Sequence, residues 1–232
     1  MDINDVFGRL DDWRGFPNYQ LERRVDIFFA VYLRKVLQEY VGPTRTDIIP
    51  EFPIKQRRSH LSDKVDYLAR SEDGRVLMLV ELKTSVLGHR IKQIQYLIRA
   101  ATDPRGPAGI LNGAEEIVGV SRSDKYAKLK ASLHSMGLLS GNQGTVPETC
   151  QIVFVQPTQD LDEVVLASLR EPIAVEYKII DFDMFAEVVE REPGELSRRF
   201  AESLWRWFEA AKLEVSRRQE RRRSNPDISG IV

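Results

Sequence analysis

The chain has few of the residues on which several common classes of protein depend. Its 232 residues include a single cysteine, Cys150, so an intramolecular disulfide and a cysteine-based zinc site are excluded. Cys150 adjoins an apolar run, which predicts a buried, inert thiol. The three histidines, His60, His89 and His134, lack the i, i+4 spacing of a helical metal site. No Walker P-loop, dinucleotide-binding glycine motif or G-x-S-x-G nucleophile elbow occurs in the sequence.

The sequence also lacks a long apolar run and a surplus of charge of either sign. No stretch approaches the roughly 18 apolar residues that a membrane-spanning helix needs, and residues 1–10 carry charges where a signal peptide is apolar. We therefore expect a cytoplasmic protein without a membrane partner. The 34 basic residues nearly balance the 35 acidic ones, giving a net charge of -1. This balance argues against a polycation that wraps nucleic acid along its whole surface, so a polyanion would have to be bound locally.

What is present is a globular composition, with 42% hydrophobic and 30% charged residues, and a length that suits one large domain spanning 1–232. Pro50 and Pro53 should confine the strand that contains them to a sheet edge or make it irregular. The proline- and glycine-rich segment 104–113 is predicted to be a loop. The mixture of elements predicts an α/β fold, a mixed central sheet flanked by helices. Residue periodicity places helices at about 18–40, 89–101, 124–136, 182–191 and 195–223, and strands at about 48–56, 64–70, 76–82, 117–120, 151–155 and 172–180.

Two charged residues, Glu81 and Lys83, stand at the end of the otherwise apolar strand 76–82. Because side chains alternate across a strand, these two must share a face. Buried charges require a partner or a metal, whereas an exposed strand end would require neither. A second Glu-x-Lys sequence, Glu176-Tyr177-Lys178, has no acidic strand paired before it and provides an internal comparison.

The preceding strand supplies a second carboxylate. Ser71-Glu72-Asp73-Gly74 predicts a tight hairpin turn. If Ser71 stands opposite Gly74, Asp66 faces Leu79, lies diagonal to Glu81 and shares its face. A bulge or a three-residue loop would shift the register by one residue and place Asp63, instead of Asp66, on the face of Glu81.

Asp66, Glu81 and Lys83 on one face suit a divalent cation. Carboxylate oxygens are ligands of Mg²⁺, which keeps further positions for water and for substrate phosphate. Such a cation, with Mn²⁺ as the alternative, would offset phosphate charge and activate a water molecule that Lys83 could orient or deprotonate. This is the chemistry of phosphodiester hydrolysis.

At these residues the chain resembles the PD-(D/E)XK nuclease superfamily. The family pattern is an acid on one strand, a short hairpin and then (D/E)-x-K on the next strand, and here it reads Val65-Asp66-Tyr67 and Glu81-Leu82-Lys83. Val65 stands where the family name has proline, a position without a ligand role. The resemblance implies a restriction-endonuclease-like α-β-β-β-α-β core over about residues 19–155, with a C-terminal strand and helical extension over 157–223.

The resemblance also implies supporting residues. Family members tend to carry a glutamate on the helix before these strands, and Glu22 matches that place. Many carry a glutamine near a tyrosine on the following helix, and Gln93 matches it, with Gln95 as the second candidate. The backbone carbonyl of Leu82 is implied as a metal ligand beside the two carboxylates.

Two groups of basic residues could hold a phosphate backbone. One precedes the Asp66 strand and consists of Lys55, Arg57, Arg58 and Lys64; the other is the basic tail over 212–232. Each group also has a simpler interpretation. The first fits a solvated loop, and the second fits a helix C-terminus whose basic side chains offset the helix dipole. Apolar residues at helical spacing on the last helix predict packing against the core or against a second copy in a homodimer.

The leading hypothesis is a Mg²⁺- or Mn²⁺-dependent nuclease whose partner is nucleic acid, with DNA favoured over RNA. An alternative is a catalytically inactive member of the same fold that binds nucleic acid or protein. A third is an unrelated α/β interaction protein whose Glu81-Leu82-Lys83 lies on the surface.

Overall fold

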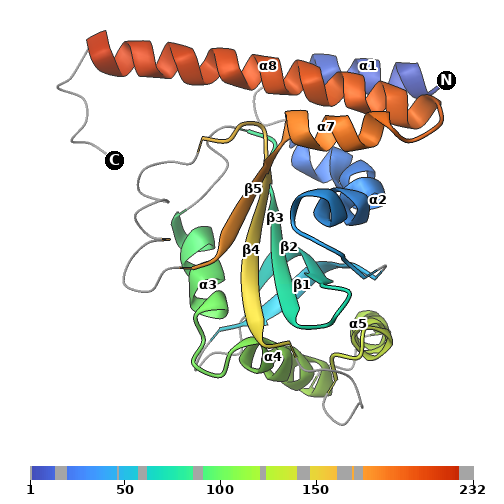
Figure 1. The fold of residues 1–232 in the computed structure, drawn as a ribbon, viewed down its shortest axis with the longest axis vertical. Coiled ribbons are helices and arrows are strands. Elements are labelled where there is room, and N and C mark those ends of the chain that lie inside the picture. Colours follow the sequence, from blue (N-terminus) through green and yellow to red (C-terminus); the bar gives the residue numbers. More distant parts are fainter. Residues whose placement is uncertain are drawn as a thin grey trace.

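A mixed five-stranded sheet lies at the centre of the computed structural model, in the order β1-β2-β3-β4-β5, with helices on both sides (Figure 1). The structure describes residues 2–13, 20–45, 47–56, 62–85, 91–120, 124–139, 147–160, 169 and 175–224. Strand β2 is antiparallel to both of its neighbours, β1 and β3, whereas β3, β4 and β5 are parallel. The chain is therefore an α/β protein, as the sequence predicts. The elements are α1 Ile3–Trp13, α2 Glu22–Tyr40, β1 Ile49–Lys55, β2 Ser62–Arg70, β3 Val76–Leu82, α3 Ile91–Ala101, α4 Pro107–Val120, α5 Asp124–Ser135, β4 Thr149–Gln156, β5 Tyr177–Asp181, α7 Phe182–Glu190 and α8 Glu195–Ser224.

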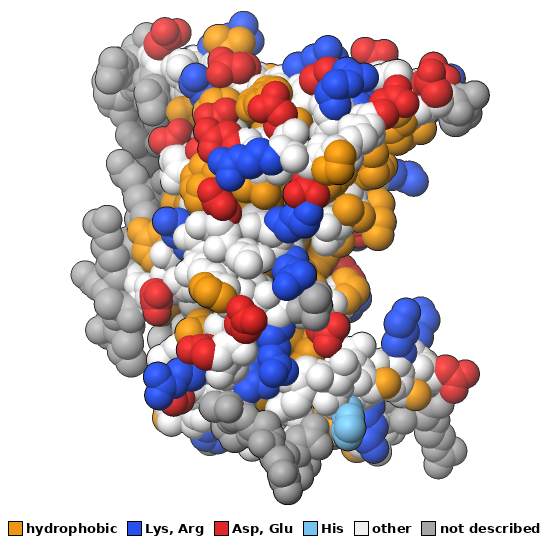
Figure 2. Space-filling model, turned by 45° about the vertical axis from the view of Figure 1, so that its right-hand side comes forward, with side chains coloured by type: hydrophobic (Ala, Val, Ile, Leu, Met, Phe, Trp, Pro, Cys, Tyr) orange, Lys and Arg blue, Asp and Glu red, His pale blue; other side chains and the backbone are white. Residues whose placement is uncertain are grey.

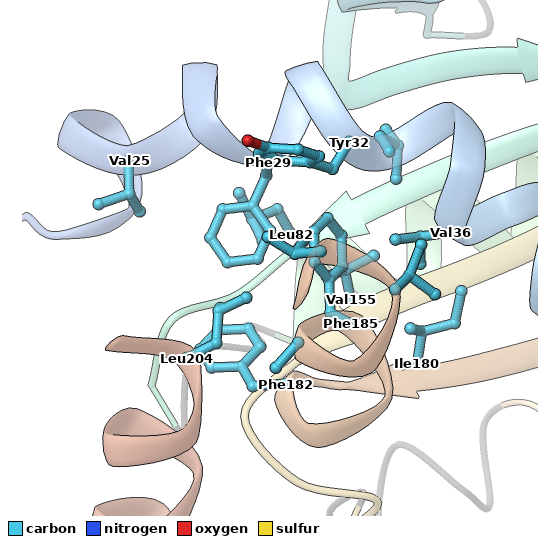
Figure 3. Close-up of a cluster of buried hydrophobic side chains, with 14 of the residues drawn as sticks. Val25, Phe29, Tyr32, Val36, Leu82, Val155, Ile180, Phe182, Phe185 and Leu204 are labelled. Atoms are coloured by element: carbon cyan, nitrogen blue, oxygen red, sulfur yellow. The ribbon is translucent and has the colours of Figure 1, made fainter. Parts of the chain in front are cut away.

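The two faces of the sheet bury two separate apolar clusters. On β3, Met78, Val80 and Leu82 point into a cluster with α1, α2, α7 and α8, part of which is shown in Figure 3. Leu77 and Leu79 point to the other side, into a cluster with α3, α4 and α5. The nearly unbroken apolar run of β3 follows from this double coverage, because both of its faces need apolar side chains.

Strand β1 lies at the edge of the sheet, as its prolines predict. Between Pro50 and Pro53, Glu51 has φ of 50°, a left-handed backbone conformation that is uncommon for a residue other than glycine. The strand nevertheless keeps one antiparallel register with β2 along its whole length.

The β2–β3 hairpin differs from the predicted register by two residues. Leu79 pairs with Leu68 rather than with Asp66. The loop is longer than a two-residue turn because the Asp73 carboxylate accepts hydrogen bonds from the Ser71 hydroxyl at 2.6 Å and from the Arg75 amide at 3.0 Å. A shift of two residues preserves the face, so Asp66 stays on the side of the sheet that carries Glu81.

The region before β4 contains a helix that the sequence does not predict. Helix α4 covers Pro107–Val120, so the expected loop at 104–113 is confined to 104–106 and the expected strand at 117–120 is wrong. Two of its three glycines, Gly109 and Gly113, serve close packing rather than a turn. A Cβ atom at Gly113 would lie 3.0 Å from the Cβ atom of Lys55 on β1, and a Cβ atom at Gly109 would lie 2.9 Å from the side chain of Asp103.

Helices α2, α3, α5, α7 and α8 agree with the predicted helices, whereas α1 is unpredicted and β5 is shorter than expected. The apolar residues Phe200, Leu204 and Trp207 of α8 are buried in the core of their own chain. Cys150 is also buried, which raises the pKa of its thiol to about 12 and supports the predicted inert thiol. None of the described helices is long and apolar enough to cross a membrane.

Candidate active site

The five predicted site residues come from four elements and meet at the carboxyl end of β3. Glu81 lies in β3, and Lys83 directly follows that strand. Asp66 lies in the neighbouring strand β2, Glu22 is the first residue of α2, and Gln93 lies in the first turn of α3. The arrangement brings together residues that are up to 71 positions apart in the sequence.

The ammonium of Lys83 is the centre of this group. Its Nζ atom lies 2.7 Å from Glu81 Oε1, 3.5 Å from Glu22 Oε1 and 3.8 Å from Asp66 Oδ2. It also donates a hydrogen bond of 2.7 Å to the backbone carbonyl oxygen of Leu82. Only 4% of the Lys83 side chain is exposed, so these oxygens compensate a charge that water does not reach.

Asp66 is held in place by the backbone of β3. The paired residues of β2 and β3 end at Tyr67 and Val80, which leaves the Leu82 amide of β3 without a partner in the β2 backbone. The amide of Leu82 donates a hydrogen bond of 2.7 Å to Asp66 Oδ2. The carboxylate therefore takes the place of a ladder bond and is directed toward Lys83.

Glu81 is the most buried of the three carboxylates, with a side chain that is 0% exposed. Its Oε1 atom accepts hydrogen bonds from Gln93 Nε2 and lies in contact with Lys83, whereas its Oε2 atom has no hydrogen-bond partner among the described residues. Burial raises the pKa of Glu81 to about 8, against the opposing effect of Lys83. A buried carboxylate oxygen without a partner is costly, and a bound cation is one way to satisfy it.

The charges at the site do not balance. With all groups ionised, three carboxylates face one ammonium, which leaves a net charge of -2. Burial raises the pKa of both Asp66 and Glu22, against the lowering effect of Lys83. Burial by itself would lower the pKa of Lys83, but its three carboxylate neighbours together raise it. A divalent cation would complete the neutralisation.

The donor atoms fit such a cation in kind. Asp66, Glu81 and the carbonyl of Leu82 supply oxygen ligands, and oxygen is what Mg²⁺ takes. Within the described residues no group of three or more Asp, Glu, His and Cys side chains is arranged to hold a metal ion. The Lys83 ammonium lies among the same oxygens, so a cation could bind there only if Lys83 moved aside.

Tyr96 on α3 belongs to the same neighbourhood, although the sequence assigns it no role. Its hydroxyl donates a hydrogen bond to the backbone carbonyl of Lys64 on β2. Tyr96 stands three residues after Gln93, so both lie on one side of the helix. That spacing is the signal from which its position could have been predicted.

The basic residues before Asp66 are engaged elsewhere. Lys55 forms an ion pair with Glu116 on α4, and Lys64 forms one of 2.7 Å with Glu51. Arg57 and Arg58 lie outside the described residues. Lys55 and Lys64, the described residues of this cluster, are therefore paired with carboxylates away from the site around Lys83.

The second Glu-x-Lys sequence has different surroundings. Glu176 is exposed and accepts a hydrogen bond of 2.9 Å from Gln151 Nε2, and Lys178, which lies in β5, has no ion pair among the described residues. The two copies of the motif thus differ in burial and in partners. Glu176 and Lys178 provide matched controls for substitutions at Glu81 and Lys83.

No protein-family model, no curated protein and no solved structure matches this chain.

Proposed function

We propose that this protein is a metal-dependent nuclease of the restriction-endonuclease-like fold, with DNA as its first expected substrate. The observation that carries the proposal is the convergence of Asp66, Glu81 and Glu22 on buried Lys83, together with the unpartnered Oε2 atom of Glu81. A cluster of charges that is largely shielded from water costs folding free energy, and such clusters are concentrated at functional sites. The resemblance of the sequence to the PD-(D/E)XK superfamily assigns the same residues.

Each residue has a distinct part in this proposal. Asp66, Glu81 and the Leu82 carbonyl would hold Mg²⁺ or Mn²⁺, which supplies charge neutralisation at the scissile phosphate and lowers the pKa of a bound water molecule. Lys83 would leave these oxygens, orient the attacking water and offset the charge that develops on phosphate. The released ammonium has a counter-ion within reach, because Glu22 Oε1 already lies 3.5 Å from it.

Gln93 would fix the orientation of Glu81. Its amide donates to one carboxylate oxygen, which leaves the other oxygen free to bind a cation. Precise placement of metal-binding carboxylates by a second layer of hydrogen bonds is a general property of metal sites. Substitution of Gln93 by leucine should therefore weaken metal binding less than loss of Glu81 itself.

Cleavage assays test the proposal. Wild type and the variants Asp66→Asn, Glu81→Gln and Lys83→Gln would be incubated with labelled single- and double-stranded DNA and RNA, with Mg²⁺, with Mn²⁺ or with EDTA. We expect wild-type cleavage that requires the cation and falls by at least about 100-fold in each variant, the usual range for losing a group that acts in the transition state.

The second Glu-x-Lys copy provides the control. Glu176→Gln and Lys178→Gln remove the same functional groups from the residue before β5 and from β5 itself. Both variants should cleave within about twofold of wild type. Equal cleavage by all six proteins would identify a contaminant and contradict the proposed site.

One observation favours a second function, that of a non-catalytic binding module of the same fold. The Lys83 ammonium already lies among the oxygens that would bind the cation, so the cluster can persist as an internal ion pair without metal. Nucleic-acid binding that is sensitive to salt, without cleavage under any cation, would favour this second function.

A further inference from the structure

The C-terminal end of α8 differs from the rest of the helix in its packing. Up to Ala211, which is 3% exposed, α8 buries one side against the body of the protein. Leu213 is 59% exposed, Val215 is half-buried, and residues 216–224 include no apolar side chain. We name residues 212–224 the α8 arm. In Figure 1 this end of α8 runs beyond α7, and no other labelled element lies along it.

The α8 arm has a strong charge bias. It contains six basic and two acidic residues, a net charge of +4, while the remaining residues carry -5. Over the face drawn in Figure 2, acidic and basic side chains are interspersed instead. Five of the six basic residues are arginines between 217 and 223, and the arginine guanidinium matches the geometry of phosphate oxygens.

Two of these arginines, Arg217 and Arg221, are exposed, and Arg218 beside them is half-buried. Arg217, Arg218 and Arg221 stand at positions i, i+1 and i+4, so they share one side of the helix. Arg218 pairs with Glu214, but neither Arg217 nor Arg221 has an ion pair among the described residues. Like charges four residues apart disfavour a helix, and a bound polyanion would relieve that repulsion. The helix dipole accounts for basic residues in the last turn only, and Arg217 and Arg218 precede that turn.

The arm's composition selects among possible partners. A second copy of the chain would need an apolar seam to pair with, and residues 216–224 offer none. Insertion into an anionic membrane surface would need an apolar face along the helix, and the arm has only Leu213 and Val215 at its start. A nucleic acid needs neither, because its phosphates are bound by exposed arginines alone.

We infer that the α8 arm binds the phosphate backbone of nucleic acid, without reading its sequence. The inference rests on the proposed function for the choice of partner, and binding measured without divalent cation keeps it separate from cleavage. The arm would act as a docking surface on the same chain as the candidate active site and would supply affinity rather than chemistry.

The test compares two triple variants of the full chain. Arg217→Gln/Arg218→Gln/Arg221→Gln removes three positive charges from the arm, and Lys125→Gln/Lys128→Gln/Lys130→Gln removes three exposed ones from α5, at the far end of the molecule (Figure 1). Glutamine retains a good helix propensity, and circular dichroism would verify that both variants keep their helices. Binding of a fluorescent DNA duplex of about 20 base pairs would be followed by anisotropy in EDTA, between about 50 and 200 mM salt.

We expect the α8 variant to bind at least about tenfold more weakly than wild type at the lowest salt. Its plot of log affinity against log salt concentration should also be less steep, by up to about 2.7 if all three arginines contact phosphate. The α5 variant should retain the wild-type slope. Equal losses in both variants, or no binding by wild type, would overturn the inference. Binding to phosphatidylserine vesicles in place of DNA would overturn it too.

Discussion

Glu81 makes the stability of the protein depend on pH. Its pKa is raised by burial to about 8, from an ordinary value of 4.5. Because the folded state holds this proton more tightly than the unfolded state does, the stabilisation is present below about pH 4.5 and is lost as pH rises through 8. In EDTA, we expect wild type to lose up to about 4 kcal/mol over that interval relative to Glu81→Gln, as measured by urea unfolding.

The matched control for this pH dependence is Glu176→Gln, which changes an exposed carboxylate. Its stability should follow that of wild type at every pH. A constant difference between wild type and Glu81→Gln from pH 4.5 to 8 would show that Glu81 titrates normally, and would remove the electrostatic argument for the site.

Lys83 and a divalent cation should compete for the same oxygens. Lys83→Gln removes the ammonium that lies 2.7 Å from both Glu81 Oε1 and the Leu82 carbonyl oxygen. We expect this variant to bind Mn²⁺ about tenfold or more tightly than wild type, because the repulsion between the two cations is lost. Isothermal titration calorimetry at pH 8 measures the affinity, and Lys178→Gln should behave like wild type. Weaker binding by Lys83→Gln would contradict the competition.

At the level of single residues, the sequence predicted the face of the site better than its exact pairing. Asp66 was selected over Asp63 by counting residues across the hairpin, and that selection survives a register error of two positions because side chains alternate with a period of two. The error arose because the Asp73 carboxylate organises a longer loop, a local interaction that the turn motif does not encode. Gln93 could be proposed only from the resemblance, since helix rotation relative to a strand is set by packing.

At the level of elements, the half-buried carboxylate of Asp11 connects α1 to α8. Asp11 Oδ2 accepts hydrogen bonds from Arg199 at 2.8 Å and from Arg206 at 3.0 Å, and its Oδ1 atom accepts one from Trp207 at 2.9 Å. The Arg199 side chain is 8% exposed; Asp11, at 2.8 Å, is its nearest counter-charge, and Glu202 is a more distant one at 3.7 Å.

Asp11→Ala should therefore destabilise the protein by about 3 kcal/mol or more, because it leaves a buried guanidinium without its main partner. Asp12→Ala, which changes the exposed neighbour, should cost less than about 0.5 kcal/mol. Urea unfolding curves of the two variants measure the difference. Similar losses for both substitutions would mean that α1 is not held through Asp11.

The sequence predicted helices correctly where regular apolar spacing extends over many turns. It failed where a helix packs through small residues. Helices α2 and α8 show many turns of regular apolar spacing and were predicted within a few residues. In α4, a Cβ atom at Gly109 would lie 2.9 Å from the Asp103 side chain and one at Gly113 would lie 3.0 Å from the Lys55 side chain, so tight packing favours glycine and the sequence resembles a loop although it forms a helix. Residues 117–120 are too short a run to distinguish strand from helix by period alone.

At the level of the whole molecule, the near-zero net charge conceals an uneven distribution. The α8 arm carries +4 and the remaining residues carry -5, with a net charge of -2 concentrated around Lys83 when all four groups ionise. Composition alone could not show this separation, because it depends on which residues fold together. It also explains how a chain with a net charge of -1 can be proposed to bind a polyanion.

We propose that Asp66, Glu81 and the Leu82 carbonyl bind one divalent cation in the place where the Lys83 ammonium now lies. Anomalous diffraction from crystals of the protein soaked in Mn²⁺ tests it most directly. We expect a single strong peak roughly 2.0 to 2.2 Å from an oxygen of each of these three residues, with Lys83 moved toward Glu22. Lys83 unmoved, with no anomalous peak at Asp66 and Glu81, would contradict it.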